Sequence, residues 1–160
     1  MAQSPKIVIQ RIKQVRKLKQ RRIHDCATLL DISKGTYAQF EEGKVSLTLP
    51  EIELLAAYFC IPSREFFDRG PINNKSISIV TSKIKPAFKK LRHKMIQAQF
   101  AYERQKRGLS LDEIHEGTGI SLKDLKAYEN GARPVPFDDL MQISEVLSLP
   151  FETFQSGIGE

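Results

Sequence analysis

The sequence predicts an all-α protein in which two five-helix domains stand in tandem, joined by a basic linker. Two observations lead to this prediction. The chain repeats itself at an offset of 88 residues, and its apolar side chains recur at steps of three and four, the spacing of one face of a helix. We divide the 160 residues into a first domain at 1–70, a linker at 71–85 and a second domain at 86–160.

The repeat is clearest where the segment 31–43, DISKGTYAQFEEG, aligns without a gap to 119–131, GISLKDLKAYENG. An ungapped match over more than 50 positions is not expected by chance. Two copies alone exclude a long solenoid. The identities at this offset are Arg16 with Arg104, Ile32 with Ile120, Ser33 with Ser121, Glu41 with Glu129, Gly43 with Gly131, Pro62 with Pro150 and Phe66 with Phe154.

The first half of each copy is expected to hold two helices. In the first copy, Val8, Ile12 and Val15 indicate the opening helix, and Ile96 and Phe100 indicate its counterpart in the second. The second helix of the second copy begins at a capping box, because Ser110 is followed three residues later by Glu113. That helix carries Ile114 on its inward face.

The second half of each copy is expected to continue with helices. Ser33 and Ser121 are suitable N-caps for the third helix, and Gly43 and Gly131 are suitable residues to end it. The inward side chains would be Tyr37 and Phe40 in the first copy, or Leu125 and Tyr128 in the second. The next helix has its apolar face at Ile52, Leu55, Ala56 and Phe59, and again at Leu140, Ile143, Ser144 and Leu147.

The linker holds the one segment with a strand-like pattern, SISIVTSKI at 76–84, where β-branched and polar residues alternate. Pro86 then suits the first turn of a helix. We expect that helix to pass through Phe88, Leu91 and Met95 into the first helix of the second copy.

Charge is distributed unevenly along the chain, whose net charge is +6. Residues 1–72 carry +4, residues 73–95 carry +7 and residues 96–160 carry −5. A basic N-terminal half suggests a polyanionic partner, although a charge run can also be a solvated face. The basic run of the linker and the helix after it consists of Lys83, Lys85, Lys89, Lys90, Arg92 and Lys94.

Composition excludes several other classes of protein. No apolar run approaches the ~20 residues of a membrane helix, so no membrane partner is expected. Cys26 and Cys60 are too few for a disulfide framework, and we expect packed thiols in a reducing cytoplasm. His24, His93 and His115 lack zinc-ligand spacing. We therefore expect no metal, no cofactor and no evident small-molecule ligand.

Each copy resembles the Cro/phage-repressor (XRE-like) helix-turn-helix family. The first copy does so through Arg16, Ile32, Ser33, Phe40, Glu41, Gly43, Ile61 and Pro62. The second does so through Arg104, Leu109, Ser110, Gly119, Ile120, Ser121, Tyr128, Glu129, Gly131, Arg133, Leu149 and Pro150. The resemblance implies phage-repressor-like domains that place the third helix in the major groove of DNA. It implies a cytoplasmic protein of prokaryotic or phage type, associated with the nucleoid when bound to DNA.

The resemblance also assigns roles to particular positions. In the first copy, Lys34, Gly35, Thr36 and Gln39 would contact bases, since lysine can donate to guanine and glutamine can pair with adenine. Arg21, Arg22, Ser33 and Lys44 would contact phosphates. Alternatively, Gly35 is merely tolerated and the cations form a solvated edge.

The second copy has Leu122, Lys123, Asp124 and Ala127 at the base-contacting positions, which makes it a poorer reader of DNA. Lys123, Lys126 and Arg133 could still hold the DNA backbone. In the family, the positions of Arg16 with Glu41, and of Arg104 with Glu129, form a largely buried ion pair between the first and third helices. We interpret both pairs as structural.

These observations predict a non-enzymatic, sequence-specific transcriptional regulator that binds double-stranded DNA chiefly through its first domain. The alternative is a protein-interaction or dimerisation module with little DNA binding by the second domain. A small hydrolase or nuclease is disfavoured because no cluster of acids, histidines or metal ligands stands out. Homodimerisation, the operator and the choice between repression and activation stay open.

Overall fold

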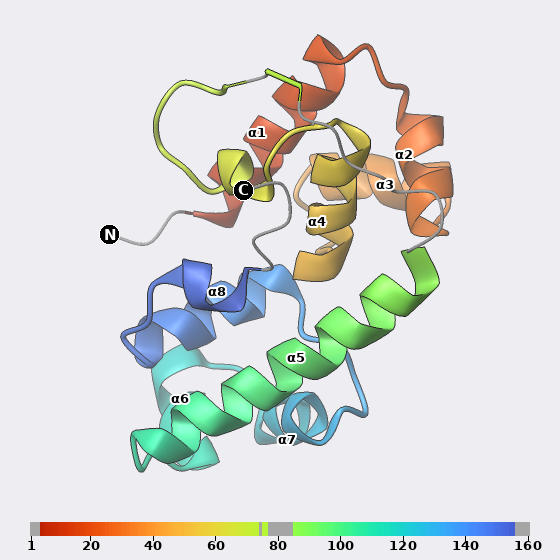
Figure 1. Ribbon diagram of the computed structural model, residues 1–160. Helices are drawn as coiled ribbons and strands as arrows, with labels where there is room; N and C mark the ends of the chain where they lie inside the picture. Colours follow the sequence, from red (N-terminus) through yellow and green to blue (C-terminus); the bar gives the residue numbers. More distant parts are fainter. Residues whose placement is uncertain (1–3, 74, 77–84, 156–160) are drawn as a thin grey trace.

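The computed structural model describes residues 4–73, 75–76 and 85–155, and throughout these residues the protein is helical without strands (Figure 1). The predicted all-α class is confirmed. The N-terminal helices are α1 (Pro5–Leu18), α2 (Ile23–Leu30), α3 (Lys34–Glu41) and α4 (Leu49–Tyr58), followed by the 3₁₀ turn η1 (Ser63–Phe66). The C-terminal helices are α5 (Lys85–Lys106), α6 (Leu111–Thr118), α7 (Leu122–Asn130) and α8 (Phe137–Val146), followed by η2 (Phe151–Phe154).

The bounds of the two sets of helices coincide at the offset of 88 residues. Shifted by that number, α2, α4 and η1 give the bounds of α6, α8 and η2, and α3 differs from α7 only by one residue at its end. The expected N-caps are present, since the Ser33 hydroxyl accepts from the amide of Thr36 and that of Ser121 from the amide of Asp124. Ser110 and Glu113 form the expected capping box.

Left-handed backbone follows the same offset. The described residues with positive φ form four pairs, namely Gln20 with Gly108, Asp31 with Gly119, Gly43 with Gly131 and Cys60 with Ser148. Each residue lies where a helix ends, a position at which glycine is favoured because it lacks Cβ. Gly43 and Gly131 end their helices as predicted, with φ of 77° and 78°. The other three positions hold Gln20, Asp31 and Cys60 in the N-terminal copy, whereas the C-terminal copy has glycine at two of them and Ser148 at the third.

Helix α5 is longer than its N-terminal counterpart, at 22 residues against 14 for α1. It begins at Lys85, so Pro86 lies in its first turn as expected. The predicted path through Phe88, Leu91 and Met95 is helical throughout, although Leu91 and Met95 are about half exposed. The strand-like segment 76–84 lies outside the described residues, apart from Ser76, whose hydroxyl accepts a hydrogen bond from Lys19 Nζ.

The described residues form two hydrophobic cores, and each core contains side chains from the helices that surround the other. The first lies among α1–α4 and the second among α5–α8. Leu49 at the start of α4 is packed in the second core, whereas Phe137 and Met141 of α8 are packed in the first. Leu49 and Phe137 are both fully buried. The two sets of helices are therefore packed directly on one another rather than separated by a solvated linker.

Backbone hydrogen bonding also joins the two sets of helices. Thr48 and Pro136 form an isolated antiparallel bridge, and the amide of Phe137 donates to the carbonyl of Leu47 at 2.8 Å. Helix α5 adds a buried ion pair, because Arg92 donates from Nε and Nη2 to Glu53 of α4 at 3.0 and 2.9 Å. The Ser46 hydroxyl also lies 3.0 Å from Oδ1 of Asp138 in α8.

The two cysteines occupy different environments. Cys26 is fully buried in α2, and this burial raises the pKa of its thiol to about 11. The thiol is therefore protonated and unreactive at neutral pH. Cys60 is partly exposed and lies in the left-handed turn after α4. Among the described helices, none has both the length and the apolar surface needed to span a bilayer.

Candidate nucleic-acid interface

Helices α2 and α3 are joined by a three-residue turn that exposes the start of α3. The turn begins at Asp31, whose left-handed backbone lets the amide of Ile32 donate to the carbonyl of Ala27 at 3.1 Å. Ser33 then caps α3, accepting at 3.0 Å from the amide of Thr36. The first amides of a helix face outward and carry partial positive charge, which favours anions near this end.

The structure brings the four base-contacting candidates together along this exposed helix. Lys34, Gly35 and Gln39 are exposed, and Gly35 and Gln39 are one turn apart on the same face. Thr36 differs, since it is half-buried and its hydroxyl lies 2.8 Å from that of Ser33. Its hydroxyl is thus engaged in the cap.

Gly35 has no packing reason to be glycine. A Cβ built at this position would meet only the Ser33 hydroxyl oxygen, at 3.9 Å. Its φ is not in the left-handed region, so alanine would adopt the same backbone. The folded chain by itself therefore tolerates a side chain here, and a reason for glycine has to be sought outside the chain.

The phosphate-contacting candidates are exposed but engaged in surface contacts that the sequence did not predict. Arg22 forms two 2.9 Å hydrogen bonds with Asp25, and Lys44 lies 2.7 Å from Glu42. These partners hold the pKa values of both carboxyls below their ordinary values. Exposed pairs of this kind are weak and exchange readily for other partners.

Arg21 and Ser33, the other two candidates, also have contacts within the chain. The guanidinium of Arg21 lies over the ring of Tyr58, with Cζ 4.8 Å from the ring centroid. Because the two residues are far apart in the sequence, no local sequence pattern predicts this stacking. Ser33 serves as the helix cap described above, and it is exposed.

A shallow groove at the N-terminal ends of α2 and α3 adds a residue that sequence reasoning missed. Its lining consists of Arg16, Arg22, Ile23, His24 and Lys34. His24 is exposed in the first turn of α2. No motif marks this histidine, and only its place beside Arg22 and Lys34 brings it to attention.

The start of α7 has the same backbone but different chemistry. Asp124 accepts from the Ser121 hydroxyl at 2.9 Å and pairs with Arg133 at 2.6 Å. The carboxylate thus neutralises one of the three expected cations, whereas Lys123 and Lys126 are exposed. Leu122, which replaces Lys34, is half-buried.

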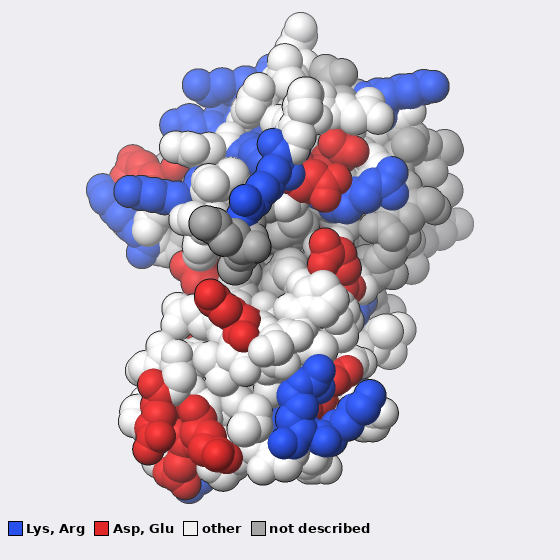
Figure 2. Space-filling model, turned by 90° about the vertical axis from the view of Figure 1, so that its left-hand side faces the viewer, with Lys and Arg blue, Asp and Glu red and all other residues white. Residues whose placement is uncertain are grey.

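The surface charge reflects this difference between the two sets of helices. In Figure 2, basic side chains are spread over the upper part of the molecule, which the N-terminal helices form. Acidic side chains cluster at one side of the base, where the C-terminal helices lie, beside a separate basic group. Helix α6 contributes Asp112, Glu113 and Glu116 to the acidic charge of this half.

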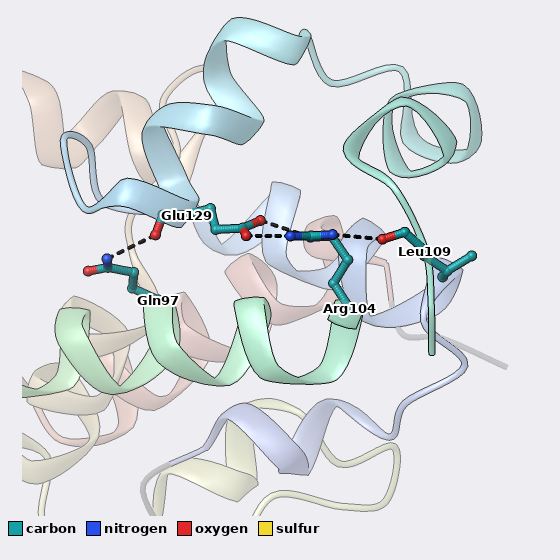
Figure 3. Close-up of polar contacts among 4 residues, drawn as sticks. All are labelled: Gln97, Arg104, Leu109 and Glu129. Atoms are coloured by element: carbon teal, nitrogen blue, oxygen red, sulfur yellow. Dashed lines mark hydrogen bonds and ion pairs between the residues drawn. The ribbon is translucent and has the colours of Figure 1, made fainter. Parts of the chain in front are cut away.

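Both expected ion pairs are formed. Arg16 donates from Nε and Nη2 to Glu41 at 2.6 and 2.9 Å, and both residues are buried. Arg104 pairs in the same way with Glu129, at 2.9 and 2.5 Å, but this pair is less deeply buried, with side chains that are 15% and 18% exposed (Figure 3). The remaining Nη1 donates to the carbonyl of Arg21 in the first pair and of Leu109 in the second.

The pairs fix the third helix of each set to its first. Arg16 joins α1 to α3, and Arg104 joins α5 to α7. In Figure 3, Gln97 of α5 also reaches α7, donating from Nε2 to the carbonyl of Glu129 at 2.9 Å. The orientation of the candidate recognition helices is therefore set by buried or half-buried polar contacts.

Comparison with known proteins identifies one part of the chain. Residues 100–154 match the family described as helix-turn-helix. The match runs from the last turns of α5 to η2, about a third of the chain, so the protein contains a helix-turn-helix domain in its C-terminal half. It does not extend to the N-terminal helices, for which the family resemblance stated above remains a prediction. No curated protein and no solved structure matches the chain.

Proposed function

We propose that the protein is a DNA-binding transcriptional regulator in which α3 lies in the major groove and reads bases. The helix-turn-helix domain at residues 100–154 supports DNA binding of this type. The observation that favours α3 as the reader is its exposed face of Lys34, Gly35 and Gln39, at a helix start that a serine caps. Side chains in this position contact base edges when such a helix enters the groove.

A second part of the proposal concerns domain organisation. Residues 1–70 and 86–160 form two phage-repressor-like units, joined at 71–85. The shared helix bounds, the four pairs of left-handed residues and the two equivalent ion pairs support it. Within this arrangement, Arg21, Arg22 and Lys44 hold the DNA backbone beside α3.

The competing function is a protein-interaction module. The pairing of Asp124 with Arg133 favours it for the C-terminal unit, because a carboxylate at the start of α7 disfavours phosphate there. This alternative predicts a folded protein with no salt-dependent affinity for duplex DNA.

A salt titration separates the two functions. We expect binding to duplex DNA to weaken steeply with salt, and Arg22→Ala to reduce the slope of log K against log salt by about one unit. Arg64→Ala is the matched control, since it removes one exposed cation from η1 rather than from the residue that precedes α2. Its slope should equal that of the parent. Absence of any salt-sensitive binding by the intact chain contradicts the regulator.

Base reading has its own measurement. Lys34→Ala should relax the sequence preference at one position of a site selected from a random duplex pool, by about 1–3 kcal/mol. Lys44→Ala should weaken binding to all sequences alike. A site preference that changes with Leu122→Ala and Lys123→Ala but not with Lys34→Ala would show that α3 is not the reader.

A further inference from the structure

The contact between the two sets of helices joins residues that are equivalent under the repeat. Thr48 and Pro136, which form the backbone bridge, are 88 residues apart. Leu49 and Phe137, the next residue of each copy, are each buried in the core of the other set. A contact in which the same patch on two units meets itself is isologous, and it implies a two-fold rotation between the units. The chain thus contains an internal approximate two-fold axis near Thr48.

The contact lies close in sequence to both candidate recognition helices. Only six residues separate the end of α3 at Glu41 from Thr48, and five separate the end of α7 at Asn130 from Pro136. In Figure 1, α3 and α7 accordingly lie on either side of the region where α4 and α8 meet. Their N-terminal turns stay exposed, because the contact is made by the segments that follow them.

The contact is built to hold one arrangement. Leu49 and Phe137 are fully buried, and the buried pair of Arg92 with Glu53 ties α5 to α4. Arg92 donates further to the carbonyl of Phe154, so one guanidinium touches both sets of helices. Separating the sets would leave these charges and apolar side chains without their partners.

Resting on the proposed function, we propose that a single chain binds DNA as a built-in pair of helix-turn-helix units. Helices α3 and α7 would enter successive major grooves of one duplex, about 10 base pairs apart, as the units of a symmetric dimer do. The two half-sites would differ, because α3 begins with Lys34, Gly35 and Thr36 where α7 begins with Leu122, Lys123 and Asp124. Asp124 is engaged by Arg133, so the half-site of α7 would be the less strictly specified one.

The experiment uses the full chain to select binding sites from a random duplex pool. The mass of the complex with a selected duplex is then measured. We expect one chain of 18.2 kDa per duplex and two unlike specified segments about 10 base pairs apart. Lys34→Ala should relax the stricter segment alone, and Leu122→Ala together with Lys123→Ala should relax the other. Thermal melting of each variant verifies that it is folded.

The possible outcomes distinguish a failure of the built-in pair from a failure of the proposed DNA-binding function. Two chains on a palindromic site would overturn the built-in pair while leaving DNA-binding regulation intact. A selected site with only one specified segment, whose base preference is unchanged by the substitutions in α7, would likewise overturn the built-in pair and leave DNA-binding regulation intact. If no duplex binds in a salt-dependent way, both the inference and the proposed function fail.

Discussion

Arg16 and Glu41 illustrate how one residue pair positions a whole helix. Each of the three guanidinium nitrogens donates, Nε and Nη2 to the carboxylate and Nη1 to the carbonyl of Arg21. The carbonyl belongs to the turn between α1 and α2, and the carboxylate belongs to α3. This buried ion pair therefore fixes the orientation of α3, and with it the direction of the exposed face of that helix.

Glu41→Ala should destabilise the protein by about 3–5 kcal/mol, because it leaves the buried Arg16 charge unpaired. Glu129→Ala should cost less, since Glu129 is 18% exposed against 3% for Glu41, so water reaches the Arg104 guanidinium more easily once the carboxylate is removed. Thermal or denaturant unfolding measures both. Glu42→Ala serves as the control, because its carboxylate is exposed and its removal should not change the unfolding free energy measurably. If Glu41→Ala melts with the parent, the pair has no structural role.

Gly35→Ala tests whether DNA is the reason for this glycine. The added methyl has room in the free protein and should stabilise α3 by up to about 1 kcal/mol. Affinity for a selected duplex should fall at the same time, because the methyl would stand between the helix backbone and the groove. Melting and DNA titration measure the two effects. Undiminished affinity would mean that Gly35 does not approach DNA.

At the scale of elements, helix ends show what the sequence could and could not predict. Ser33, Ser121, Gly43 and Gly131 are local signals, and each begins or ends a helix as expected. Gln20, Asp31 and Cys60 adopt the same left-handed backbone without being glycine. Only the fold, which forces the chain to turn there, determines their conformation.

Gln20→Gly should stabilise the protein by about 1 kcal/mol, because it relieves the left-handed strain of a residue with Cβ. The second copy already has Gly108 at this position. Gly108→Ala is the reciprocal substitution and should destabilise by a similar amount. Denaturant midpoints measure both changes. Equal stability of all three proteins would show that the turn at Gln20 is unstrained.

The candidate site was predictable to a similar extent. The exposure of Lys34 and Gln39 follows from the amphipathic pattern, which already places Tyr37 and Phe40 inward. The stacking of Arg21 on Tyr58 depends on how α4 packs and has no local signal. The same holds for the exchange between cores, because Leu49 and Phe137 are apolar whichever core receives them.

For the whole molecule, the contact between the two sets of helices contains a titratable group. Burial is the main cause that raises the pKa of Asp138 above its ordinary value of 3.8, and the Asp139 carboxylate adds to it, while the hydrogen bond with Ser46 opposes the rise. The folded chain therefore binds this proton more tightly than the unfolded chain. The free energy of unfolding falls as pH rises from 3.8 through the folded pKa.

Asp138→Asn should consequently be more stable than the parent at pH 7, since asparagine avoids the burial of a charge and still accepts from Ser46. The difference should disappear below the unfolded pKa of 3.8, where the aspartate is protonated in both states. Unfolding curves of both proteins between pH 3 and 7 provide the measurement. A variant less stable than the parent at pH 7 would contradict this sign.

The bridge between Thr48 and Pro136 also affects how the molecule can vary. When two identical chains form a symmetric contact, every substitution appears twice, once on each side of the axis. Here the two sides are encoded 88 residues apart, so each can change alone. Leucine at 49 facing one core and phenylalanine at 137 facing the other already represent such a divergence. A contact of this kind can preserve its symmetry of shape while losing its symmetry of sequence.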